Sequence, residues 1–205
     1  MTLKYQSHTY ETGLHPMSIV TGDFNRDSIV DLGVTNFESH TISILLGNIN
    51  GTFQTQHIFS TGDGSGPQEI TIGDFDNDTF LDLVIISFHS NTLQVQLSFG
   101  NGNFLTQIYL TDVYPTSITV INFNDDKIDD LAILHCNGAV SVFLGLKIGI
   151  FNRHYLSFQN YTTINGKCAQ SLRVIDLNQD GRDDVVFVDP EMNVIRLLLG
   201  SQCDE

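Results

Sequence analysis

The sequence predicts an all-β protein made of four repeated units, each a small antiparallel sheet. Three observations support this prediction. An acidic nine-residue loop occurs four times, the loops start at residues 23, 74, 122 and 176 with intervals of 51, 48 and 54 residues, and short apolar segments with turn signals fill the intervals. Periods of this length are typical of propellers and solenoids. No segment carries a capped helical pattern, so the expected class is all-β.

The second loop defines the motif. Asp74, Asp76, Asp78 and Asp82 stand at positions one, three, five and nine of the loop. Carboxylates this close repel one another unless a cation lies between them. Calcium binds six to eight oxygen atoms and tolerates irregular geometry better than magnesium does. The spacing therefore predicts a calcium loop, in which the backbone carbonyl of Phe80 at position seven is a further ligand.

The other three loops keep this frame, with Asp or Asn at the ligand positions. Acids in a single loop can equally form a solvated surface, and the repetition in phase is what favours metal binding. The predicted ligands, with the backbone carbonyl at position seven included, are Asp23, Asn25, Asp27, Ile29 and Asp31; Asp74, Asp76, Asp78, Phe80 and Asp82; Asn122, Asn124, Asp126, Ile128 and Asp130; and Asp176, Asn178, Asp180, Arg182 and Asp184.

The third loop is expected to bind metal most weakly, because affinity follows the number of charged ligands. Asn122 replaces the leading acid, so only Asp126 and Asp130 are charged in frame. Asp125 and Asp129 lie one position out of frame. They either restore the charge of the loop or belong to the surface.

An EF-hand is excluded for these loops, since it needs a Glu at position twelve and flanking helices. The flanking segments here read as short strands. Position twelve is occupied by Val34, Ile85, Ile133 and Phe187, and position six, usually Gly in an EF-hand, by Ser28, Thr79, Lys127 and Gly181.

The charge of the chain follows from the loops. The formal net charge is −15, and 15 of the 24 acids lie within the four loops. The nine Lys and Arg residues are scattered without a basic run, which disfavours nucleic acid as a partner. Residues 1–10 have neither a basic nor an apolar region, and no apolar stretch is long enough to span a bilayer. Neither a signal peptide nor membrane insertion is expected.

Three cysteines are too few for a disulfide framework or a zinc site. Cys136 ends an apolar run and is expected to be a buried thiol, since free Cys is commonly a core residue. A Cys136–Cys168 disulfide is the alternative, and the state of Cys203 stays open.

One domain is expected, with repeats over residues 16–62, 67–112, 115–159 and 169–200. In the first repeat the expected strands are 17–22, 32–36, 41–46 and 52–60. The turns before the fourth strand carry Asn and Gly, a hairpin signal. Residues 9–13 resemble residues 58–62, so the chain begins on the last strand of a repeat, over residues 1–13.

Several strands, such as residues 140–144 and 195–199, are apolar on both faces. Four-stranded sheets with two apolar faces stack around an axis as the blades of a β-propeller. The fourth repeat ends after three strands, so the first strand of the chain is expected to complete it and close a four-bladed ring, which removes exposed edges. An open arc of a larger propeller is the alternative.

These motifs resemble the FG-GAP or VCBS repeats, found in integrin α-subunit heads and some fungal lectins. The resemblance rests on Pro-x-x-Ile-x-x-Gly-Asp-Phe at residues 67–75, on Asp-Leu after the loops, and on Leu-Leu-Gly-Asn-x-Asn-Gly-Thr-Phe at residues 45–53. It implies calcium-braced blades. Asn122, the non-Gly residues at position six and the presence of only four repeats depart from the family pattern.

We expect a non-enzymatic module that binds a glycan or a protein, as lectins and adhesion proteins do. The expected ligand surface includes turn residues Phe37, His40, Phe88, His89 and Asn91, although turn residues commonly bind nothing. Sequons at Asn50, Asn77 and Asn160, together with calcium, point to an extracellular or secreted location. The alternatives are a lyase or hydrolase acting in a central channel and a purely structural module. The sequence contains neither an H-E-x-x-H nor a G-x-S-x-G motif.

Overall fold

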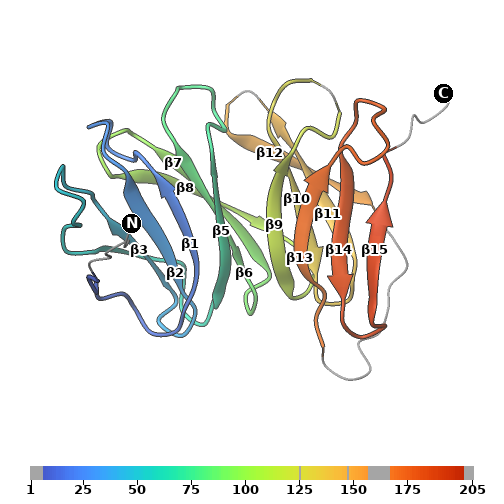
Figure 1. The fold of residues 1–205 in the computed structure, drawn as a ribbon, viewed down its shortest axis with the longest axis horizontal. Helices are drawn as coiled ribbons and strands as arrows, with labels where there is room; N and C mark the ends of the chain where they lie inside the picture. Colours follow the sequence, from blue (N-terminus) through green and yellow to red (C-terminus); the bar gives the residue numbers. More distant parts are fainter. Residues whose placement is uncertain (1–6, 125, 147, 157–166, 201–205) are drawn as a thin grey trace, which may run out of the picture.

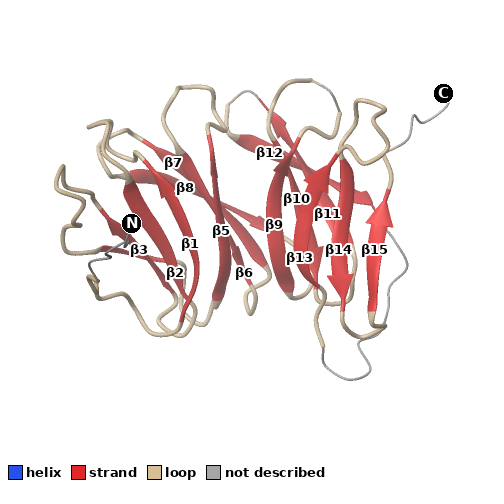
Figure 2. Ribbon diagram, viewed as in Figure 1, coloured by secondary structure: helices blue, strands red, loops and turns tan. Residues whose placement is uncertain are grey.

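A computed structural model describes residues 7–124, 126–146, 148–156 and 167–200, and these form strands and turns without a helix (Figures 1 and 2). Fifteen strands form four antiparallel sheets. The strands are β1 (Pro16–Gly22), β2 (Asp31–Asn36), β3 (Thr41–Leu45) and β4 (His57–Ser60) in the first sheet; β5 (Pro67–Gly73), β6 (Asp82–Ser87), β7 (Thr92–Ser98) and β8 (Phe104–Leu110) in the second; β9 (Pro115–Ile121), β10 (Asp130–His135), β11 (Val140–Leu146) and β12 (Ile150–Leu156) in the third; and β13 (Gln170–Ile175), β14 (Asp184–Asp189) and β15 (Val194–Leu198) in the fourth.

Within each sheet the strands pair in chain order, so every sheet is a meander. The prolines that begin β1, β5 and β9 occupy the edge strand of their sheet, where a missing N–H removes no ladder bond. β4 was expected to start at residue 52 but starts at His57. Residues 48–52 instead form a turn, which the Asn48 N–H closes by donating to the Thr52 carbonyl at 2.8 Å.

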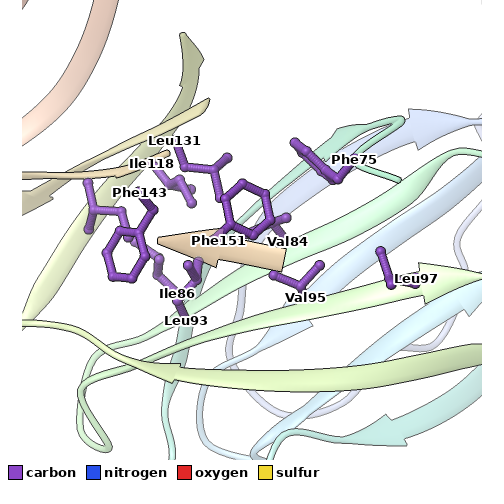
Figure 3. Close-up of a cluster of buried hydrophobic side chains, with 11 residues drawn as sticks. Phe75, Val84, Ile86, Leu93, Val95, Leu97, Ile118, Leu131, Phe143 and Phe151 are labelled. Carbon is purple, nitrogen blue, oxygen red and sulfur yellow. The ribbon is translucent and has the colours of Figure 1, made fainter. Parts of the chain in front are cut away.

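The four sheets lie side by side along the long axis of the molecule, in chain order (Figure 1). Three clusters of buried apolar side chains fill the spaces between neighbouring sheets. In the cluster between the second and third sheets, Val84 and Val95 meet Ile118, Leu131 and Phe143 (Figure 3). A central strand such as β6 is buried at every position because a neighbouring sheet covers each of its faces. The prediction of stacked all-β sheets is confirmed.

An aromatic pair near the outer strand joins the first sheet to the second and another joins the second sheet to the third, and we call this pair the aromatic clasp. Phe59 of the first sheet packs edge-on against Phe104 of the second, with ring centroids 5.5 Å apart, and Tyr109 of the second packs against Phe151 of the third at 6.1 Å. The Tyr109 hydroxyl also accepts the Phe151 N–H at 3.1 Å. The clasp therefore recurs at these two junctions, at the same place in each pair of sheets.

The expected ring closure is wrong, and the open arc describes the molecule. Residues 7–13 form no strand; they lie against the first sheet, where the Gly13 N–H donates to the Asn36 side chain at 3.0 Å. The fourth sheet has three strands among the described residues and lies at the far end of the arc (Figure 1). Residues 1–6 of the expected closing strand and residues 157–159 of the third repeat lie outside the described residues. No described helix is long and apolar enough to cross a membrane.

Cys136 and Cys168 form a disulfide, so the expected buried thiol at Cys136 is wrong and the alternative holds. The bond joins the turn after β10 to the segment before β13 and so links the third and fourth sheets covalently. The Ala169 N–H donates to the Cys136 carbonyl beside it at 3.1 Å. Cys203 and the sequon at Asn160 lie outside the described residues.

Reduction of this disulfide is expected to destabilise the protein. The two cysteines are 32 positions apart, and closing a loop of that size lowers the entropy of the unfolded chain by an amount worth about 3 to 4 kcal/mol. Urea unfolding of the oxidised protein and of a Cys136→Ser, Cys168→Ser variant measures the difference. Equal midpoints for the two proteins would show that the bond does not stabilise the fold.

Candidate metal centre

The four acidic loops connect the first and second strands of each sheet, along the upper edge of the view in Figure 1. The backbone turns sharply within each loop, because position six has a positive φ in all four: 64° at Ser28, 74° at Thr79, 64° at Lys127 and 84° at Gly181. This left-handed conformation costs least for Gly and most for a β-branched residue such as Thr79. Three loops therefore hold a strained conformation that their own sequence does not favour.

The second loop brings three carboxylates together. Asp74, Asp76 and Asp78 each offer an oxygen, and these oxygens lie within 4.8 Å of one another. Asp74 accepts the N–H groups of Asp78 (3.0 Å) and Thr79 (2.9 Å), which folds the loop around its first residue. Burial and the neighbouring charge of Asp78 raise the pKa of Asp76. A cation between these carboxylates would oppose that shift.

The first and fourth loops have the same internal bonds. Asp23 accepts the N–H groups of Asp27 and Ser28 at 3.2 and 2.8 Å, and Asp176 accepts those of Asp180 and Gly181 at 3.1 and 2.9 Å. At position three, the Asn25 and Asn178 amides donate to Asp27 and Asp180, the acids at position five, at 3.0 Å each. Positions one, three and five thus converge in both loops.

Position seven joins this arrangement through its backbone. The N–H of each position-seven residue donates to the acid at position five at 2.8 to 3.0 Å. These pairs are Ile29 with Asp27, Phe80 with Asp78, Ile128 with Asp126, and Arg182 with Asp180.

The position-nine aspartates make backbone hydrogen bonds that the sequence did not predict. Asp31, Asp82, Asp130 and Asp184 are completely buried. One oxygen of Asp82 accepts the N–H of Phe75 at position two (2.9 Å), and the other accepts the N–H of Ser98 at the end of β7 (2.8 Å). Asp31, Asp130 and Asp184 make the equivalent pairs of bonds. Each of these side chains therefore ties its loop to the end of the third strand.

Burial shifts the titration of these carboxyl groups. Desolvation raises the pKa of Asp82 to about 6, in opposition to the bonds from Ser98 and Phe75, which favour the charged form. Burial raises the pKa of Asp31 and Asp130 in the same direction. A cation beside the loop would offset this cost.

The third loop differs at its first position, as its sequence predicts. Among the described residues, Asn122 accepts neither of the two N–H bonds that Asp23, Asp74 and Asp176 accept. Its own N–H donates instead to Asp183 of the fourth loop at 3.0 Å. A carboxylate from the neighbouring sheet thus stands beside the position that lacks one. Asp183, at position eight of its loop, is not among the predicted ligands.

Asp183 is one case of a contact that recurs along the arc, in which position eight of one loop lies near the start of the loop before it. The charge of Asp74 contributes, after burial, to the raised pKa of Asp129. In the second loop the side chain of Leu81 lies so close to Gly22 that an added Cβ at Gly22 would be 2.7 Å from it. Arg26 adds a further contact between loops, with its guanidinium 3.9 Å from the centre of the Phe80 ring.

A second polar group lies between the second and third sheets. The Ser141 hydroxyl donates to Asp112 at 3.0 Å and lies 2.9 Å from Nε2 of His135, while Arg153 pairs with Asp112 at 2.7 Å. Ser141 and His135 are buried, and burial lowers the pKa of His135 to about 4. In a catalytic triad the acid bonds the histidine and the serine is accessible. Here the acid bonds the serine, so the group is a structural link.

At the opposite end of the strands from the loops, five rings form a row across three sheets, which we call the aromatic row. Phe37 lies 5.0 Å from His89 and 6.4 Å from Phe88, and Phe88 lies 5.0 Å from Tyr114, between ring centroids. His15 extends the row to 5.7 Å from Phe37.

Three of the expected surface residues, Phe37, Phe88 and His89, therefore lie together. The other two make backbone contacts: His40 accepts the Gly66 N–H at 3.2 Å, and Asn91 accepts the Tyr114 N–H at 2.7 Å.

The radially stacked sheets and the in-phase loops define a β-propeller-like repeat protein, and comparisons with known proteins agree. The family model of the FG-GAP-like repeat matches residues 23–85, which hold the first two loops. The match confirms the predicted resemblance to FG-GAP repeats over this part of the chain. No curated protein matches the chain.

Three solved structures share the fold. A lectin of Agrocybe aegerita, described as recognising non-reducing terminal N-acetylglucosamine, has a TM-score of 0.56 and 18% identity over 82% of this chain and 45% of its own. BBS1N in complex with ARL6DN has a TM-score of 0.59 and 10% identity over 91% and 58%. A candidate 6-phosphogluconolactonase from Bacteroides uniformis has a TM-score of 0.56 and 14% identity over 92% and 57%. The chain thus spans about half the length of each.

The buried carboxyl of Asp82 leads to a prediction about pH in the metal-free protein. Because its folded-state pKa is raised from 3.8 to about 6, its contribution to stability is present at low pH and is lost as pH rises through 6. An Asp82→Asn variant lacks this titration. The free energy of unfolding of the wild type, relative to that of the variant, is expected to fall by up to about 1.4 kcal/mol per pH unit near pH 5 to 6.

Urea unfolding in chelator across that pH range measures the difference. Subtracting the unfolding free energy of the variant cancels the titration of His135, which both proteins share. The lowered pKa of His135 makes stability rise with pH, in opposition to Asp82. A difference that does not change with pH would contradict the burial argument.

Proposed function

We propose that the protein is a non-enzymatic module whose loops bind calcium and whose aromatic row binds a carbohydrate. The observation that supports calcium most directly is the convergence of Asp74, Asp76 and Asp78 in an exposed loop whose frame recurs in the other sheets. The donor set consists of carboxylate, amide and backbone oxygens, which suits a hard cation.

In this proposal the side chains at positions one, three and five and the carbonyl at position seven hold the ion. The position-nine carboxylates retain their bonds to the backbone and contribute their remaining lone pairs. The ion would supply positive charge at the centre of each loop, and four ions would offset more than half of the net charge of −15. Asp183 stands where it can restore a charged ligand to the third loop.

Calcium is expected to raise the melting temperature, and a chelator is expected to abolish the increase. A ligand at a hundredfold excess over its Kd adds about 2.7 kcal/mol of stability per site. Calorimetric titration and thermal unfolding in calcium, magnesium and chelator measure the effect. An Asp76→Asn, Asp78→Asn variant should bind fewer ions than wild type.

An Asp63→Asn variant is the matched control, because Asp63 is an exposed acid outside the loops. It should keep the wild-type stoichiometry. A wild-type melting temperature that does not change when calcium is added would contradict metal binding.

The carbohydrate part rests on the aromatic row and on the lectin-like structural neighbour. Rings that are partly exposed offer flat apolar faces for the C–H groups of a sugar, and neighbouring polar groups orient its hydroxyls. His89 and Tyr114 are exposed, whereas Phe37 and Phe88 beside them are partly buried. Sequons at the exposed residues Asn50 and Asn77, together with calcium loops, are consistent with an extracellular protein.

A glycan array is expected to retain the labelled protein. The double variant His89→Ala, Tyr114→Ala is expected to bind the retained glycan with at least tenfold lower affinity. Phe99→Ala is the matched control, since Phe99 is 57% exposed on a turn outside the row. Circular dichroism confirms that all variants fold. Retention of no glycan would reject the carbohydrate, and equal binding by the double variant would reject the row as its site.

A further inference from the structure

The far end of the arc presents an unpaired strand and an apolar face. β15 is hydrogen-bonded to β14 on one side only within the described chain, while β3, β7 and β11 each carry a fourth strand. Ile195 and Leu197 are 74% and 47% exposed, although the residues at the same places in β3, Ile42 and Ile44, are buried against the second sheet. Ile175 and Val188 extend the same exposed face. This end has the character of a sheet-to-sheet interface without its neighbour.

The near end holds the matching half of such an interface. Tyr10 packs edge-on against Phe53 with ring centroids 5.4 Å apart, and its hydroxyl accepts the Phe53 N–H at 3.2 Å. This is the aromatic clasp of Tyr109 with Phe151, in which the first partner belongs to the outer strand of the preceding sheet. Residues 8–11 therefore stand beside the first sheet where the outer strand of a preceding sheet would stand.

We propose that two copies of this chain assemble head to tail, with residues 8–11 of one copy added to β15 of the other as its fourth strand. The register of β3 with β4 fixes the pairing, since Ile44 faces His57 and Ile42 faces Phe59. The equivalent pairs are Leu197 with His8 and Ile195 with Tyr10 of the second copy. Tyr10 keeps its clasp to Phe53 and gains a sheet behind it.

The same contact joins the two apolar faces. Between the first and second sheets, Ile42 and Ile44 pack against Ile70. At the new interface Ile195 and Leu197 of one copy correspond to Ile42 and Ile44. Ile19 of the other copy, which is 60% exposed, corresponds to Ile70. Because each copy contributes one end of each kind, the contact is heterologous and forms a ring only if its rotation closes.

Two copies are the number that the comparisons favour. The arc covers 45% to 58% of the length of the propeller-like neighbours, so two arcs supply about the length of one neighbour. Two copies give eight sheets, within the range of known propellers. The inference concerns assembly, so it is independent of the proposed calcium and carbohydrate binding.

Sedimentation and light scattering of the 205-residue chain test the assembly. The expected mass is twice 22.8 kDa, and an Ile195→Asp variant is expected to sediment as a folded monomer. Ile49→Asp, at a turn residue that is 95% exposed, is the matched control and should stay dimeric. A monomeric wild type, or equal masses for the two variants, would overturn the proposal.

Cross-linking tests the register. In a Cys203→Ser background, His8→Cys together with Leu197→Cys is expected to give a covalent dimer on oxidation. His8→Cys together with Ile49→Cys is expected to stay uncrosslinked. A ladder of higher species would show an open chain of copies in place of the ring, and a reducible band at monomer mass would show closure within one copy. Either result would overturn the two-copy ring.

Discussion

The arc depends on the aspartate at position nine of each loop, a carboxylate that is buried although burying a charged group is costly. In each sheet the aspartate at position nine is removed from solvent and accepts one N–H from the loop and one from the end of the third strand. An unpartnered buried backbone N–H costs about 1 to 3 kcal/mol, so losing the side chain would leave two such groups per sheet. The loop is thereby joined to the edge of the sheet at a single residue. The turn at position six keeps its positive φ because this aspartate fixes the start of the loop at position two and its end at position nine.

Once the loops are fixed, their outward positions decide how the sheets meet. Position eight of each later loop interacts with the start of the loop before it: Leu81 with Gly22, Asp129 with Asp74 and Asp183 with Asn122. The chemistry of that contact changes from apolar to acidic along the arc, while its geometry stays the same. An acid at this position adds negative charge to a loop that already repels itself. One loop can therefore receive a side chain from the next loop without a change in fold, as Asp183 beside Asn122 illustrates.

The sequence was sufficient for the features that repeat and insufficient for those that do not. The loops, the order of strands and the stacked sheets follow from period and alternation, because each is determined within one repeat of about 50 residues. The arc could not be distinguished from the ring, because strand phase at residues 9–13 is the same whether the partner is β15 of the same copy or another sheet. The disulfide was left open for a similar reason: Cys136 and Cys168 are brought together only by the packing of the third sheet on the fourth. At position nine, an acid in a ligand pattern looks the same in sequence whether it faces metal, backbone or both.

The disulfide lies at the junction of the third and fourth sheets, beside the apolar cluster that fills it. Each inner sheet gains stability from two neighbours, whereas a terminal sheet gains it from one. Among the described residues, the contact between the third and fourth sheets has no aromatic clasp, because the clasp needs a ring at the start of a fourth outer strand. That contact also begins with Ala169 where the other repeats carry a proline. A covalent bond from Cys136 to Cys168 supplies at this junction the constraint that rings and prolines supply at the others. The covalent bond therefore holds the terminal sheet against the third sheet, although β15 has no fourth strand beside it among the described residues.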